Sequence, residues 1–340
     1  MSTITLGIIG GGQLGSMLAI AAKKLGIKTI ILCDDADAPA QNFCNKFINS
    51  NYNDNEKIIE FVNQVDIVTY EFENIPFETL NEINKLKNVL PKPSVNRLIQ
   101  HRLAEKDFVN KLNIRTTRYV SIKEKSEIQT LDDFLPGILK TVTLGYDGKG
   151  QYPINSIEEL NELDIDFSKG YILEKLVKLK KEISIVITRF DNLKYEIYEP
   201  IENTHQDQIL KYSKIPADIS EKLFEQSRNW AIMIAEELKY VGTLCVEFFI
   251  DRNENLYVNE IAPRVHNSGH LTINAFNVSQ FENHIRAVCG LEQIHLKKIS
   301  NAKMINLIGD QITPYRKKNN FNKNEFFFDY LKKEIKKKRK

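Results

Sequence analysis

A glycine-rich turn lies between a strand and a helix near the start of the chain. Residues 4–9 are apolar and predict a buried strand, Gly10 to Gly15 follow the pattern Gly-x-Gly-x-x-Gly, and Gln13 to Leu25 can form a helix. Glycines at such a turn let the backbone approach a phosphate at the amino end of the helix. The pattern therefore predicts a phosphate-binding βαβ unit at the N-terminus.

The following segments continue this alternation. Lys28 to Leu32 and Ile67 to Tyr70 predict further strands, and Phe77 to Leu86 predicts a helix. Alternating strands and helices indicate a doubly wound parallel sheet, which binds ligands beyond the carboxyl ends of its strands. Glu71 and Glu73 follow such an end.

One interpretation of the turn is a dinucleotide site. Asp34 ends the second strand nineteen residues past Gly15, where an acidic residue would bind a ribose. An NAD-dependent oxidoreductase is therefore one candidate. The glycines alone are less specific, because they suit any phosphate at a helix terminus.

The pattern of predicted secondary structure changes near residue 117, after helical segments at 94–112. Strands become longer and hairpin-like; Lys181 to Thr188 alternates strictly, and Ile219 to Leu238 predicts a long helix. At 340 residues the chain allows two or three domains. We expect an α/β fold with an N-terminal doubly wound domain at 1–93, linker helices and a small α+β lid at 94–177, and a larger α+β C-terminal domain at 178–340.

Composition excludes several classes. The net charge is +2, but Lys332 to Lys340 hold seven bases and one acid, which leaves 40 bases and 44 acids elsewhere. We therefore expect no nucleic-acid partner. No apolar run is long enough to span a membrane, and the N-terminus lacks the pattern of a signal peptide. The scattered cysteines favour a reducing cytoplasm over a disulfide or zinc framework; they are Cys33, Cys44, Cys245 and Cys289.

A second glycine-rich segment runs from Leu144 to Gln151 and carries Lys149 between glycines. Its amides and ammonium group could cover phosphates as a closing flap. Lys140 ends the preceding apolar segment and is expected near the base of this flap.

Two glutamates are predicted to face each other on a hairpin. If Asn253 and Glu254 are its two turn residues, Glu247 and Glu260 are directly opposed, with Cβ atoms about 4.5–5.5 Å apart. A four-residue loop keeps this register and an odd-length loop does not. Like charges so placed are stabilised by a cation between them, and Mg²⁺ suits two carboxylates plus substrate phosphates.

Polar residues are dense immediately after Glu260. Arg264 can bind a phosphate in bidentate fashion, and two histidines, an asparagine and a serine follow it before residue 271. Such a loop is typical of a binding site. The residue types would also allow zinc, but no His-x-x-x-His spacing supports it.

The chain resembles N5-carboxyaminoimidazole ribonucleotide synthetases, which are ATP-grasp enzymes of bacterial and fungal purine synthesis. The resemblance runs from Gly7 to about Lys340 and rests on four segments: Gly10-Gly11-Gly12-Gln13-Leu14-Gly15, Gly145-Tyr146-Asp147-Gly148-Lys149-Gly150-Gln151, Tyr240-Val241-Gly242, and Asn259-Glu260-Ile261-Ala262-Pro263-Arg264-Val265-His266-Asn267-Ser268-Gly269-His270.

The resemblance implies an ATP-grasp fold with ATP between the lid and the C-terminal domain. Residues implied to hold the nucleotide are Arg102, Lys140, Gly145, Tyr146, Asp147, Gly148, Lys149, Gly150, Gln151, the adenine hinge Glu174, Lys175, Leu176 and Val177, then Glu182, His205, Asn259 and Glu260. Glu247 and Glu260 would carry Mg²⁺. Residues implied to face the ribonucleotide are Gly12, Gln13, Leu14, Glu73, Tyr146, Lys149, Arg264, His266, Asn267 and Ser268, with Lys149, Arg264 and Asn267 nearest the chemistry.

The implied reaction is ATP-dependent carboxylation of 5-aminoimidazole ribonucleotide by bicarbonate, through carboxyphosphate, in a cytoplasmic homodimer. Lys149 and Gln208 stand where many relatives have arginine and glycine. Relatives continue past the position of Arg339-Lys340, so we expect this chain to lack the family's last strand and helix, with the substrate-phosphate lysine among Lys332, Lys333 and Lys340. The alternatives are another ATP-grasp ligase (a formate-dependent transformylase or a biotin-carboxylase-like subunit), the oxidoreductase, or a truncated non-catalytic relative.

Overall fold

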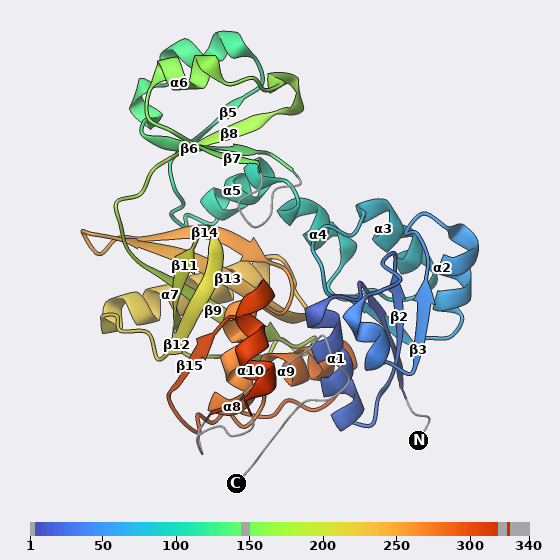
Figure 1. The fold of residues 1–340 in the computed structure, drawn as a ribbon. Coiled ribbons are helices and arrows are strands. Elements are labelled where there is room, and N and C mark those ends of the chain that lie inside the picture. Colours follow the sequence, from blue (N-terminus) through green and yellow to red (C-terminus); the bar gives the residue numbers. More distant parts are fainter. Residues whose placement is uncertain (1–3, 144–149, 319–324, 327–340) are drawn as a thin grey trace.

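The computed structural model describes residues 4–143, 150–318 and 325–326. Within them the chain forms three sheets, and each sheet belongs to a different part of the molecule (Figure 1). The first belongs to the N-terminal region, the second is a small outlying lid, and the third is the large sheet of the C-terminal region. None of the helices in these ranges is long and apolar enough to cross a membrane.

The N-terminal sheet is parallel, as the alternation of strands and helices predicts. Its strand order is β3 (Lys46–Asn49), β2 (Lys28–Cys33), β1 (Thr5–Ile9) and β4 (Ile67–Tyr70). Helices cover both faces, and the apolar residues of each strand alternate between two cores. The helices are α1 (Gln13–Lys24), α2 (Asn55–Val62) and α3 (Phe77–Leu86).

This region is docked against the C-terminal one through helices. Leu18 and Ala22 on α1 share a core with Phe281 and Ile285 on α9 (Gln280–Val288). The shared core fixes the carboxyl ends of the parallel strands beside the large sheet. Glu73 therefore contacts Arg264, which is 191 positions later in the sequence.

The lid is a four-stranded antiparallel sheet at the far end of the molecule (Figure 1). Ile122, Leu139 and Leu173 pack with the short helix α6 (Ile157–Glu162) in a core of their own. The strand order is β5 (Tyr119–Ile122), β8 (Tyr171–Lys175), β6 (Gly137–Thr141) and β7 (Gln151–Ile154).

The large sheet is antiparallel and runs in the order β14 (Leu256–Ala262), β13 (Gly242–Asp251), β9 (Leu179–Arg189), β11 (Ile201–Gln206), β12 (Ile209–Ile215) and β15 (Ala302–Ile305), with β10 (Tyr195–Ile197) paired to β9. Ile183, Ile185 and Ile187 pack with α7 (Glu221–Glu237) on one face, as their alternation predicts. The loop after β14 and α8 (Thr272–Ala275) cover part of the other face.

Two linker helices join these parts. α4 (Pro93–Ile99) and α5 (Arg102–Lys111) lie between the N-terminal region and the lid (Figure 1). The chain then passes β14, where Thr116 Oγ1 donates to the Val258 carbonyl and Val258 N–H donates to the Arg115 carbonyl. α5 is thus held against the large sheet. The predicted divisions at residues 93 and 177 fall between the sheets and remain a proposal for the domain limits. After β15 the described chain ends in α10 (Thr313–Lys317).

Candidate active site

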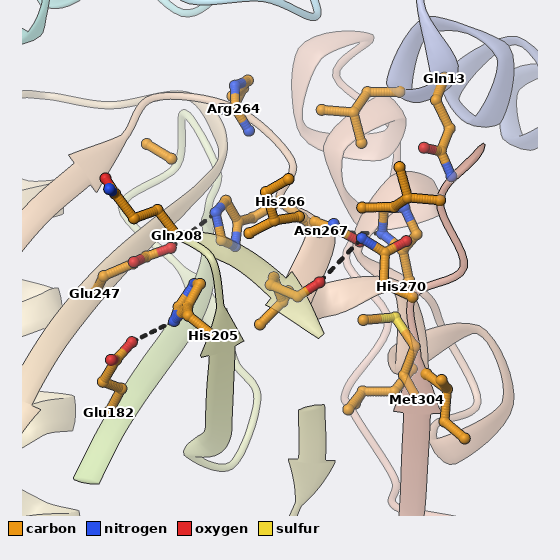
Figure 2. Close-up of a pocket in the computed structure, with 18 of the residues that line it drawn as sticks. Gln13, Glu182, His205, Gln208, Glu247, Arg264, His266, Asn267, His270 and Met304 are labelled. Atoms are coloured by element: carbon orange, nitrogen blue, oxygen red, sulfur yellow. Dashed lines mark hydrogen bonds and ion pairs between the residues drawn. The ribbon is translucent and has the colours of Figure 1, made fainter. Parts of the chain in front are cut away.

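A cavity of about 1540 Å³ lies between the large sheet, the lid and the N-terminal region. Its wall includes residues from all three parts, and Figure 2 shows Gln13 toward one end and Glu182 toward the other. Fourteen of the residues expected from the sequence line it: Gln13, Leu14, Glu73, Arg102, Lys140, Gln151, Glu182, His205, Glu247, Asn259, Glu260, Arg264, His266 and Asn267.

Glu247 and Glu260 are directly opposed across β13 and β14. The predicted turn is wrong, because the loop has three residues, Arg252 to Glu254, and Phe248 pairs with Val258. A β-bulge next to Glu247 then inserts one extra residue and restores the pairing of the two glutamates. The expected carboxylate pair is therefore present for a different geometric reason.

Each glutamate of this pair has a basic neighbour. His266 Nε2 lies 2.9 Å from Glu247 Oε1, and Arg102 lies 3.7 Å from Glu260 Oε2. Burial alone would raise the pKa of Glu247, but His266 outweighs it and the pKa lies below its ordinary value. Glu247 thus favours its charged form, and both carboxylates line the cavity.

The loop after β14 is held by hydrogen bonds behind the cavity wall. Ser268 is fully buried, and its hydroxyl lies 2.9 Å from His266 Nδ1 and 2.8 Å from the Ser184 hydroxyl. Asn203 donates to Ser184, which continues this network into the large sheet. Ser268 is therefore a support for His266 in this structure and does not line the cavity.

Arg264 connects this loop to the N-terminal region. Its guanidinium forms a bidentate pair with Glu73, with Nη2 2.9 Å from Oε1. Burial alone would raise the pKa of Glu73, but the Arg264 charge outweighs it and lowers that pKa. Both side chains line the cavity, as does Gln13.

The glycine turn binds a carboxylate of the chain itself. Glu71 is buried and accepts hydrogen bonds from Gly12 N–H (2.9 Å) and Gly15 N–H (3.2 Å) at the amino end of α1. A Cβ at Gly10 would lie 2.8 Å from the Glu71 side chain, which explains the glycine there. These amides are those that would bind a pyrophosphate, so this structure gives no support to the dinucleotide interpretation. Gly12 itself is absent from the cavity wall.

The other end of the cavity carries the expected nucleotide residues. Glu182 forms a hydrogen bond with His205 Nδ1 (Figure 2). Burial would lower the pKa of His205, but this carboxylate outweighs it and raises that pKa. Lys140 and Gln151 are paired across β6 and β7, so the lid contributes both of them to the cavity wall.

Some expected site residues do not line the cavity. Gly150 and the four hinge residues Glu174 to Val177 are outside its wall, and the Glu174 side chain is buried between lysines. Tyr171 and Leu173 of β8 point into the core of the lid, so Glu174 lies on the opposite face of the strand, where Lys106 and Lys140 cover its carboxylate. The flap residues Gly145, Tyr146, Asp147, Gly148 and Lys149 lie outside the described residues, as do Lys332, Lys333 and Lys340.

The cavity also has wall residues that the sequence did not single out. Glu105 is buried one turn after Arg102, and its carboxylate accepts the Ile261 N–H at 2.5 Å. Burial, followed by the Glu260 charge, raises the pKa of Glu105 to about 8. Helical spacing from Arg102 could have indicated this position. The segment from Ser300 to Ile312 also contributes, but it carries no motif.

Comparison with known families gives two matches in order along the chain. Residues 1–100 match the ribonucleotide synthetase preATP-grasp domain, and residues 107–281 match the ATP-grasp domain. Together they cover most of the cavity wall, whose residues at 102–105 and from Ile299 onward lie outside the two matches. The fold expected from the resemblance, ATP-grasp with a parallel N-terminal sheet, is confirmed.

Similar curated proteins cover nearly the whole chain. N5-carboxyaminoimidazole ribonucleotide synthase of Brucella melitensis is 41% identical over 91% of this chain and 86% of its own length. That of Bacillus subtilis is 38% identical over 98% of this chain and 89% of its own. The chain belongs to the N5-carboxyaminoimidazole ribonucleotide synthase family.

Solved structures of this family have the same fold. The Staphylococcus aureus N5-carboxyaminoimidazole synthetase, complexed with ADP, superposes with a TM-score of 0.90 at 35% identity, covering 100% of this chain and 92% of that one. The Aspergillus clavatus synthase, in complex with ADP and 5-aminoimidazole ribonucleotide, gives 0.82 at 25% identity over 90% and 82%. The family is thus an ATP-grasp ligase family.

Proposed function

We propose that this protein is an ADP-forming ligase that carboxylates the exocyclic amine of 5-aminoimidazole ribonucleotide in purine biosynthesis. The observation that carries the proposal is one cavity that joins a carboxylate pair, at the nucleotide end, to the Arg264–Glu73 pair at the other. The family relatives have this activity in their names.

The nucleotide is assigned to the end formed by the lid and the large sheet. Lys140 and Arg102 supply positive charge for phosphates, and Glu182 supplies a carboxylate for the ribose hydroxyls. Asn259 lies beside the metal candidate Glu260 at this end. The backbone of residues 174–177 and the flap at 145–151 remain the proposed contacts to adenine and phosphates.

The carboxylate pair fits a Mg²⁺ ion. Two opposed glutamates that both line the cavity provide the oxygen donors that this ion prefers, beside cations that suit phosphates. Glu247 and Glu260 would hold the ion, and when bound it would neutralise phosphate charge during phosphoryl transfer. The described residues contain no cluster of three or more His, Cys, Asp or Glu side chains that could hold a metal by themselves.

The ribonucleotide is assigned to the opposite end. Gln13 and Leu14 enter from the glycine turn, Glu73 and Arg264 form the bidentate pair, and His266 and Asn267 follow on the same loop. Tyr146 and Lys149, which lie outside the described residues, are proposed to face the ribonucleotide, with Lys149 supplying a single-point charge.

The reaction that fits this arrangement begins with bicarbonate. A bicarbonate oxygen attacks the γ-phosphorus, the bond to ADP breaks, and carboxyphosphate forms. It releases phosphate and CO₂, and the substrate amine captures the CO₂ with loss of a proton. The residues around the cavity act by orienting the reactants and by balancing charge, and flap closure would exclude water from the labile intermediate. No general base is assigned.

The test is phosphate release from MgATP with and without the ribonucleotide and bicarbonate. We expect release to require both, and the product to contain carbon from labelled bicarbonate. Incorporation from labelled formate would favour the transformylase, and tight NADH binding without ATP binding would favour the oxidoreductase. Absence of turnover with intact ATP binding would indicate a non-catalytic relative. We also propose a cytoplasmic homodimer, which light scattering on the purified protein and fractionation of cells test.

A further inference from the structure

A buried lysine lies behind the nucleotide end of the cavity. Lys106 is on α5 and is 3% exposed, and it belongs to neither the cavity wall nor any expected set of site residues. Burial of an ammonium group is costly unless it is paired and hydrogen-bonded. The groups around Lys106 must therefore offset the cost of burying it.

The partners of Lys106 lead to the cavity. Its Nζ lies 3.2 Å from Glu174 Oε2 and donates to the hydroxyls of Thr116 (3.0 Å) and Thr117 (2.9 Å). The other oxygen of the same carboxylate, Glu174 Oε1, lies 3.1 Å from Lys140 Nζ. Lys140 is the member of this cluster that lines the cavity.

The charges of this cluster do not cancel. Two lysine side chains share one carboxylate, so the cluster carries one net positive charge when both lysines are protonated. Burial lowers the pKa of Lys106, and the charges of Glu174 and Glu105 oppose that shift. Burial alone would raise the pKa of Glu174, but Lys140 and then Lys106 outweigh it and lower that pKa to about 2. The carboxylate is therefore charged at neutral pH. If Lys106 were uncharged, Glu174 would neutralise Lys140 completely.

The hydrogen bonds around Glu174 also leave one of its carboxylate oxygens for Lys140. Thr117 Oγ1 donates to Glu174 Oε2 at 2.9 Å, so the oxygen bound by Lys106 is also tied to the start of the lid. Only Oε1 is directed to Lys140. Lys106 and Thr117 thus fix the orientation of the carboxylate, and the carboxylate fixes Lys140.

We propose that Lys106 is a positioning residue for the nucleotide phosphates: it occupies half of the Glu174 carboxylate, so that Lys140 is held in place without losing its charge. The proposal rests on the assignment of ATP to this end of the cavity. It adds to that assignment a residue that acts on the ligand only through two others.

The test compares a ligand that has phosphates with one that has none. Lys106→Met keeps most of the side-chain length and removes the charge. We expect it to weaken ATP binding about tenfold, while the affinity for adenosine changes less than about twofold. Titration calorimetry measures both, and thermal unfolding checks that the variant is folded. Equal losses for both ligands would indicate a general distortion of the lid and contradict the proposal, as would no loss for ATP.

A double variant gives the decisive control. Lys106→Met combined with Glu174→Gln restores one net positive charge to the cluster. We expect its ATP affinity to be at least about threefold higher than that of Lys106→Met, and below that of the unaltered chain because Glu174 belongs to the proposed nucleotide site. If the double variant binds ATP as weakly as, or more weakly than, Lys106→Met, the charge argument is wrong. If Lys106→Met does not fold, Lys106→Gln takes its place in both comparisons.

These outcomes are independent of the overall reaction. An unaltered chain that does not bind ATP would contradict the proposed function itself. An unaltered chain that binds ATP, with variants that bind it equally well, would contradict only the role of Lys106. In steady-state assays, Lys106→Met should raise the KM for ATP and leave the KM for the ribonucleotide nearly unchanged.

Discussion

Glu247 on β13 faces Glu260 on β14 because a β-bulge shifts the register of the strands between the hairpin turn and this pair. The turn is a three-residue loop whose last residue, Glu254, has φ +60°, a common hairpin geometry. Between this turn and Phe248 the two strands pair in the register that a three-residue loop sets, so Phe248 faces Val258. Without the extra residue, Glu247 would face Asn259. The bulge therefore aligns two like charges at the cavity wall, a costly arrangement that a bound cation would stabilise.

The carboxylate pair should be essential for turnover. Glu260→Gln keeps the shape of the side chain and removes one charge from the proposed metal site, so we expect kcat to fall on the order of 100-fold or more. Phosphate release from MgATP measures this. Glu254→Gln at the exposed turn of the same hairpin is the matched control and should retain normal activity. Near-normal turnover of Glu260→Gln would contradict the metal role.

The bidentate pair between Arg264 and Glu73 should matter for the ribonucleotide. Arg264→Lys keeps the charge but replaces the planar fork with a single point, and we expect kcat/KM for the ribonucleotide to fall roughly 10- to 100-fold. The KM for ATP should change little. Arg286→Lys tests the same exchange on α9, where Arg286 pairs with Glu282 away from the cavity wall, and should be nearly silent. A similar loss in both variants would argue against a specific role.

Glu71 should organise the glycine turn as an internal hydrogen-bond acceptor, and burial raises the pKa of its carboxyl group. Glu71→Ala leaves the amides of Gly12 and Gly15 without their acceptor, so we expect the KM for the ribonucleotide to rise about tenfold through displacement of Gln13. Added formate or acetate can enter the vacated space and should partly restore the KM. Glu78→Ala, at the exposed start of α3, is the control. A defect that carboxylates do not relieve would mean that Glu71 does more than accept these two hydrogen bonds.

Stability at low pH should report the charge of Glu174. The pKa of this group in the folded chain is about 2, below the ordinary 4.5, so its ionised form stabilises the fold above about pH 4.5. That contribution is lost as the pH falls from about 4.5 toward 2. Denaturant unfolding of the unaltered chain and of Glu174→Gln should therefore show a difference in free energy of unfolding that is largest at pH 6 and shrinks at pH 3. A constant difference would indicate that the carboxylate is not ionised in the folded state.

Much of the fold follows from local patterns. The helix from Phe77 to Leu86 has the predicted limits, and the isoleucines of β9 lie on one buried face as their alternation requires. These features depend on residues close together in the sequence, where hydrophobic period and turn chemistry act directly. The hairpin register was not predictable in the same way, because the conformation of Glu254 and the bulge are set by packing in the sheet.

The sequence by itself determined the class of fold, the two glycine segments and the polar loop from Asn259 to His270, because each is carried by residues that are near one another in the chain. The pairing of Glu247 with Glu260 depends in addition on a bulge that packing in the sheet sets. Only the tertiary structure decided that Glu71 occupies the amides of the glycine turn, that Arg264 pairs with Glu73, and that Lys106 reaches Lys140 through Glu174. In each case the partners come from distant elements. Their charges select one another only after burial has removed water and hydrophobic packing has fixed the distances between them.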